Sequence, residues 1–138
     1  MMRLLLFKIF KKIIKPFRGA GFGLMRIKLI ALVYSFLVVK LKPDFFEIDG
    51  IKMFLDKNDN LEFSVREYEP EIRKIFKSHV KRGCTVVDIG AHIGYYTLLS
   101  AKLVGPEGKV FAFEPNPENC LILERSIAAN NFHNVQLI

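Results

Sequence analysis

The stretch from residue 85 to residue 138 alternates short apolar runs with segments of helical spacing. The runs TVVDIG, KVFAFE and NVQLI are rich in β-branched and aromatic residues, which pack well on the pleated surface of a sheet. Residues 95–104 and 117–129 lie between these runs and predict helices. Strands that alternate with helices over short connections are parallel, because each helix returns the chain to the same end of the sheet. The order therefore predicts an α/β fold built on a parallel sheet.

Residues 44–82 precede this stretch and carry a different pattern. Two short β-rich runs, FFEI and IKMFL, flank the pair Asp49-Gly50. Because this pair tolerates the positive φ angles of a type I′ turn, we expect a hairpin. Residues 70–80 begin with a proline and are followed by Gly83, which is typical of one helix. Its apolar residues fall at helical spacing: Ile72, Ile75, Phe76 and Val80.

The positive charge of the chain is concentrated in residues 1–43. They hold ten Lys or Arg and no acid, whereas residues 44–138 hold eleven basic and fourteen acidic residues. The arm is also apolar at helical spacing, a pattern typical of a segment that lies on an anionic membrane surface. Three interpretations stay open: packing on the domain or on a second copy, as an oligomer; attachment to the membrane surface; and a signal anchor with residues 24–41 in lipid. The apolar run at 29–39 has eleven residues, against about 20 for a span. We expect no nucleic-acid partner, because the domain itself is net acidic.

Two acids stand at the carboxyl ends of neighbouring predicted strands, where α/β sheets bind their ligands. Asp88 precedes a turn with glycines at 90 and 94, and Glu114 ends the next strand. Glycines let the backbone approach a ligand closely, and an acid at the second strand tip is placed to accept both hydroxyls of a ribose. The spacing therefore predicts a nucleoside pocket.

The same turn lacks the features of a phosphate site. Its glycines read G-x-x-x-G with no third glycine, and no Walker lysine is present. Asp88 would repel a phosphate and suits an ammonium group. This pattern disfavours a nicotinamide-dependent oxidoreductase and favours S-adenosylmethionine, which has a ribose, an amino group and a sulfonium.

Four segments carry a family resemblance. VVDIGAHIGYYT resembles motif I of class I methyltransferases, and VFAFEPNPEN resembles their acidic motif II. Together with YEP at 68–70 and NNFHNVQLI, they resemble the FkbM family over about residues 50–138. The resemblance implies an incomplete Rossmann-like parallel sheet, the first three strands of a class I methyltransferase, preceded by a β-hairpin and N-terminal helices. The resulting division is a basic helical arm at 1–43, a hairpin and helix at 44–82, and the N-terminal half of a methyltransferase domain at 83–138.

The resemblance also implies which residues bind S-adenosylmethionine. Asp88, Gly90 and Gly94 would line its methionine end, and Glu114 would hold the ribose. Four neighbours would flank the pocket: Ala91, His92, Pro115 and Asn116. His92 stands where many members have glycine, and we expect it to pack against the cofactor rather than to act as a base or a metal ligand. Glu69 has two interpretations, a favourable charge at a helix N-terminus or a carboxylate that faces the pocket.

The activity implied is O-methylation of a sugar, a glycan or a small metabolite. Because residue 138 lies inside the third strand, we expect a fragment that is inactive alone and contains no catalytic residue. No metal site is expected, since Cys84 and Cys120 lack ligand spacing and should be buried, reduced thiols of a cytoplasmic protein, peripheral at the inner face of the membrane if the arm binds lipid. The alternative function is a noncatalytic membrane-surface or interaction protein built on half a domain.

Overall fold

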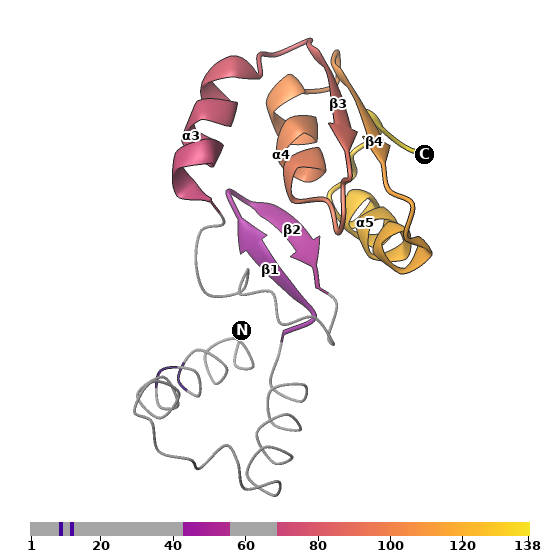
Figure 1. Cartoon of the computed structure of the whole chain (residues 1–138). Helices are drawn as coiled ribbons and strands as arrows, with labels where there is room; N and C mark the ends of the chain where they lie inside the picture. The colour runs from indigo at the N-terminus through magenta and orange to yellow at the C-terminus, as the bar shows by residue number, and fades with distance from the viewer. Residues whose placement is uncertain (1–8, 10–11, 13–42, 56–68) are drawn as a thin grey trace, which may run out of the picture. The chain divides into compact units, whose positions relative to one another are not determined.

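Figure 1 shows the computed structural model of the chain, which describes residues 9, 12, 43–55 and 69–138. The expected helices of the arm and the polar loop at 56–60 lie outside the described residues. Contacts divide the chain into two compact units, Met1–Asp44 and Phe45–Ile138. The second unit holds every strand and helix described below.

Three parallel strands form the sheet of this unit, in the order β3-β4-β5. They are β3 (Thr85–Ile89), β4 (Lys109–Phe113) and β5 (Val135–Leu137). Val87 pairs with Phe111, and Phe111 pairs in turn with Gln136. The strand order and the parallel pairing confirm the predicted α/β fold.

Two helices connect these strands and cover one face of the sheet. They are α4 (Tyr95–Val104) and α5 (Pro117–Ala129), with the bounds that the sequence predicts. Val110 and Ala112 of β4 lie beneath them and are 1% and 0% exposed. Most of α4 is buried all round, as expected of a helix that is covered on both sides.

The hairpin covers α4 and α5 in addition to the sheet, because its second strand contacts both helices. Its strands are β1 (Phe45–Ile48) and β2 (Ile51–Phe54), joined by Asp49 and Gly50 with φ angles of 52° and 69°. The predicted hairpin and its turn are therefore confirmed. Asn130, at the end of α5, continues the hydrogen bonding of β2: its side chain accepts from Lys52 N at 2.8 Å and donates to Lys52 O at 2.6 Å.

Helix α3 (Pro70–His79) packs with an unexpected face inward. Arg73 is only 5% exposed, whereas Ile72 and Ile75 are 53% and 60% exposed. The reason is electrostatic, because Arg73 and Lys77 both form ion pairs with the carboxylate of Asp49 in the hairpin turn. Hydrogen bonds from Lys77 and then Arg73 hold the pKa of Asp49 below its ordinary 3.8, against the effect of burial.

The opposite face of the sheet is apolar and exposed. Ile89 is 83% exposed, Val87 57% and Phe113 38%, and no other described segment covers them. Among the described strands, β3 stands at one end of the sheet order. Parallel sheets are ordinarily buried on both faces, but the described helices of this unit cover only one face of the sheet.

Both cysteines are free thiols. Cys120 is half-buried, but Cys84 is exposed, so the expectation of two buried thiols is wrong for Cys84. It directly precedes β3, which stands at one end of the described sheet order. Within the described residues, no group of three or more metal-binding side chains gathers, and no helix there is long and apolar enough to cross a bilayer.

Candidate functional site

The turn after β3 is fastened to the end of β4. The backbone N–H groups of Gly90 and Ala91 both donate to the carbonyl of Phe113, at 2.9 and 3.0 Å. Gly94 N then donates to Ala91 O at 2.8 Å, which closes the turn before α4 begins. Ala91 is 4% exposed, so it contributes its backbone to the site and its methyl group to the core.

The two glycines of this turn have different surroundings. Both have positive φ, 79° at Gly90 and 92° at Gly94. A Cβ added at Gly90 would meet nothing within 4 Å, whereas one added at Gly94 would lie 2.1 Å from Cδ1 of the buried Leu123. Gly90 therefore leaves open space where a ligand can approach. Gly94 is buried, and it permits the close packing of α5 against the turn.

The carboxylate of Glu114 is held at the tip of β4 by three donors. Its Oε2 accepts from His92 N at 2.7 Å, and its Oε1 accepts from Asn116 N at 2.9 Å and from Asn119 Nδ2 at 3.2 Å. Burial opposes ionisation of this group, but the three hydrogen bonds and the charge of His92 together outweigh it and lower the pKa of Glu114 below its ordinary 4.5. The group is therefore an acceptor at neutral pH.

One acceptor position of Glu114 remains open. An ionised carboxylate offers about four lone-pair positions, and the three donors occupy three of them. The side chain of Asn119 makes the longest of the three bonds. It can rotate away, whereas the other two donors are backbone N–H groups. Glu114 can therefore accept one further hydroxyl directly and a second by replacing Asn119.

His92 and Asn116 reach this carboxylate through their backbones. His92 has a φ of 53°, in the left-handed region that favours glycine, and its N–H points to Glu114 in that conformation. The side chain of Asn116 caps α5 by accepting from Glu118 N at 2.9 Å. Pro115 and Asn116 are both exposed at the edge of the site.

Asp88 is bound by a hydroxyl on the first turn of α4. Thr97, which is fully buried, donates from Oγ1 to Oδ2 of Asp88 at 2.5 Å. Asp88 itself is half-buried at the carboxyl end of β3. The bond fixes one carboxylate oxygen and leaves the other as an acceptor at the same end of the sheet as Glu114.

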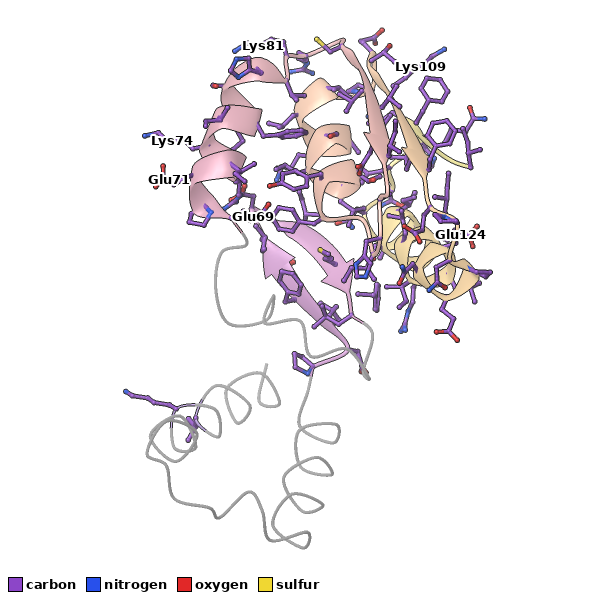
Figure 2. The ribbon with its side chains drawn as sticks, in the orientation of Figure 1. Glu69, Glu71, Lys74, Lys81, Lys109 and Glu124 are labelled. Atoms are coloured by element: carbon purple, nitrogen blue, oxygen red, sulfur yellow. The ribbon has the colours of Figure 1, made fainter. Side chains whose placement is uncertain are left out.

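Glu69 stands at the start of α3, at the end of that helix nearest the hairpin (Figure 2). It is the N-cap residue, with a φ of 43°, but its side chain makes no capping bond. Its Oε2 instead accepts from the hydroxyl of Tyr96 in α4 at 3.0 Å. The Glu69 carboxylate is therefore bound to α4 by a residue 27 positions away, and not to the N–H groups of its own helix.

The structure thus brings His92, Glu114 and Asn116 together by direct hydrogen bonds and joins Asp88 and Glu69 to the first turn of α4. The sequence did not indicate the three side chains that donate these hydrogen bonds to the carboxylates: Tyr96, Thr97 and Asn119. Only Asn119 had a local signal, since it follows the capping residue Asn116 at the spacing that returns a side chain to a helix N-terminus.

The same region matches a known family. Residues 88–137 match the family described as the Methyltransferase FkbM domain. The chain is 32% identical over 59 residues to protein-L-isoaspartate O-methyltransferase of Methanothrix thermoacetophila, covering 43% of this chain and 28% of that protein. The corresponding protein of Ignicoccus hospitalis is 33% identical over 61 residues, covering 44% and 29%. The chain therefore spans less than a third of the length of these relatives.

Two solved structures share the fold. TYW2 of M. jannaschii, in complex with AdoMet, has a TM-score of 0.52 and 28% identity over 68% of this chain and 41% of that one. Trm5b of Pyrococcus abyssi has a TM-score of 0.51 and 28% identity over 68% of this chain and 27% of that one. The aligned share of the present chain includes more than the segment of residues 88–137.

Proposed function

We propose, from the match of residues 88–137 to the FkbM family of methyltransferases, that the protein binds S-adenosylmethionine at the carboxyl end of the sheet and transfers its methyl group. The observation that carries the proposal is Glu114, an ionised carboxylate at the tip of β4 with an acceptor position open. A ribose diol is the ligand group that such a carboxylate suits.

Glu114 would hold the ribose through its two oxygens. One hydroxyl can use the open position, and the other can replace the side chain of Asn119, whose bond of 3.2 Å is the longest. The backbone N–H groups of His92 and Asn116 would keep the carboxylate in place while this exchange occurs. The pocket walls would come from the exposed residues beside it, His92, Pro115 and Asn116.

The turn after β3 would receive the methionine end. Gly90 leaves space for the ligand, and Asp88 offers the carboxylate oxygen that Thr97 does not use. Gly94 and Ala91 support this wall from inside, because both are buried. The turn holds no lysine or arginine, and this composition together with the presence of Asp88 disfavours a phosphate-bearing ligand.

Bound S-adenosylmethionine supplies a methyl group on a positively charged sulfur. The residues of this chain bind and orient it, and none of the described side chains is assigned as an acid or a base. Positioning contributes most of the rate in such a displacement. We propose a hydroxyl of a sugar, a glycan or a small metabolite as the acceptor, with its contacts supplied outside residues 45–138.

The test is calorimetric titration of the full-length protein with S-adenosylmethionine. Glu114→Ala should weaken binding by about 1.5–3 kcal/mol, the range for hydrogen bonds to a charged group. Glu124→Ala is the matched control, because Glu124 is an exposed acid on the outside of α5 (Figure 2). Unchanged affinity in Glu114→Ala would remove this residue from the site, and no binding by the unmodified protein would favour a noncatalytic scaffold.

We further propose that residues 1–43 bring the protein to the inner face of the cytoplasmic membrane. Ten basic residues without an acid favour an anionic surface by about 1 kcal/mol for each basic residue near it. Co-sedimentation with phosphatidylserine vesicles should fall with added salt and in a variant with Lys8, Lys11, Lys12 and Lys15 changed to Gln. Equal binding to neutral vesicles would contradict this proposal, and release by detergent alone would favour a signal anchor.

A further inference from the structure

We infer that Tyr96 is a positioning residue, whose hydroxyl holds the Glu69 carboxylate so that it accepts the ammonium group of the bound cofactor. This inference rests on the proposed function and names a contact to the amino-acid end of the ligand. It starts from a bond between two segments far apart in the chain, Tyr96 Oη to Glu69 Oε2 at 3.0 Å.

The backbone of Glu69 adopts a conformation that the helix does not need. Its φ of 43° and ψ of 64° are left-handed, which is uncommon for a residue with a Cβ. A capping side chain would offset this cost by binding the free N–H groups of α3, but Glu69 makes no such bond. Its carboxylate is turned away from its own helix and toward α4.

Packing holds the ring of Tyr96 from two sides. Its centroid lies 5.0 Å from that of Phe76 in α3 and 5.1 Å from that of Tyr95, with interplanar angles of 55° and 82°. Both arrangements are favourable for aromatic pairs. The phenol is therefore a rigid donor, and the Glu69 oxygen that it binds has a defined place while the other oxygen stays available.

Tyr96 and its neighbour Thr97 each donate a hydrogen bond to a different carboxylate. Thr97 holds Asp88, at the carboxyl end of β3, by a bond of 2.5 Å, and Tyr96 holds Glu69, at the start of α3. Two acceptor carboxylates held from consecutive residues of α4 suit an ammonium and repel a phosphate. The amino-acid end of S-adenosylmethionine carries an ammonium of this kind.

Contacts to the amino-acid end of the ligand can be tested separately from contacts to its adenine and ribose. Methylthioadenosine has the adenine and the ribose of the cofactor but lacks its amino-acid end. Glu69→Gln and Tyr96→Phe should therefore weaken S-adenosylmethionine and leave methylthioadenosine unchanged, whereas Glu114→Ala should weaken both. We expect a loss of about ten- to a hundredfold for Glu69→Gln, the size of one hydrogen bond to a charged group, and a loss of a few-fold for Tyr96→Phe.

The experiment is titration of the full-length protein and these variants with both ligands, with a thermal melt of each variant. Tyr96→Phe keeps the ring packing, so the melt should move little. Because Tyr96 acts through Glu69, Tyr96→Phe should have no further effect in the Glu69→Gln background.

Equal losses for both ligands would show a merely structural bond between α3 and α4, and additive effects would show that Tyr96 acts alone; either result overturns the inference. Unchanged affinity in Glu69→Gln, with a clear loss in Glu114→Ala, would overturn it and leave the proposed function intact. If no variant and no unmodified protein binds S-adenosylmethionine, the proposed function fails and this inference fails with it.

Discussion

Gly94 and Gly90 make a matched pair that separates packing from ligand binding. Gly94→Ala would place a methyl group 2.1 Å from Cδ1 of Leu123, a side chain that is 0% exposed. Gly90→Ala would place the same group in open space. Since both glycines have positive φ, the backbone cost is shared and only the surroundings differ.

The loss of stability expected for each variant follows from these surroundings. Holding alanine in a left-handed conformation costs about 1–2 kcal/mol, and overpacking a tight core costs about 1–3 kcal/mol more. Gly94→Ala should therefore lower the free energy of unfolding by roughly 2–5 kcal/mol, and Gly90→Ala by only about 1–2 kcal/mol. At about 4–8 °C for each kcal/mol in a domain the size of Phe45–Ile138, the melting temperatures of the two variants should be clearly distinct.

The affinity for S-adenosylmethionine should change more in Gly90→Ala than in Gly94→Ala, which is the opposite order to the loss of stability. The methyl group of Gly90→Ala would occupy the space that we propose for the cofactor, so affinity for S-adenosylmethionine should fall at least about tenfold, the effect of 1.4 kcal/mol. Folded Gly94→Ala should bind more nearly as the unmodified protein does. The assays are chemical denaturation and calorimetry on the full-length protein.

A third variant tests the clash itself. Leu123→Ala alone leaves a cavity and costs about 2–5 kcal/mol, but it also makes room for the methyl group at residue 94. The double variant should therefore be more stable than the sum of the two single losses predicts. Additive losses, or a Gly90→Ala variant that is less stable than Gly94→Ala, would refute the assignment of Gly94 to packing.

Three further predictions concern charge and the exposed sheet face. Asp49→Asn should destabilise the protein by about 1–3 kcal/mol, because it removes the carboxylate that pairs with both Arg73 and Lys77. Since the folded pKa of Asp49 is lowered, its contribution to stability is present above the unfolded pKa and lost as pH falls through the folded pKa, so urea melts should show a weaker acid dependence in the variant. Glu114 likewise has a lowered pKa, so cofactor affinity in calorimetric titrations should be constant at neutral pH and decline only in acid, below the ordinary value of 4.5; a decline already at neutral pH would contradict this reasoning. Residues 45–138 expressed alone should bind a hydrophobic dye and show no methyl transfer, because Val87, Ile89 and Phe113 are exposed; a sharp thermal transition raised by S-adenosylmethionine would contradict this.

The strands, helices and hairpin were predictable because their signals are local. Alternation of apolar runs marked β3 and β4, a proline and an asparagine marked the start of α5, and the Asp49-Gly50 pair marked the turn. The placement of Asp88 and Glu114 at the strand tips also followed from order alone, because parallel strands end at one edge. Glu114 is therefore a residue that the sequence identifies without any tertiary contact.

The remaining features depend on contacts between distant segments. Ile72 and Ile75 have the spacing of a buried face, but Asp49, more than twenty residues earlier, draws Arg73 inward instead. No pattern at residue 96 indicates that its hydroxyl meets Glu69, and Gly94 reads as a ligand-facing glycine until α5 places Leu123 against it. The sequence by itself determined the elements, their parallel order and the acid at the strand tip, because these depend on neighbours along the chain. Only the tertiary structure decided which side chains hold the carboxylates and which glycine faces open space, because those depend on how α3 and α5 pack against the first turn of α4.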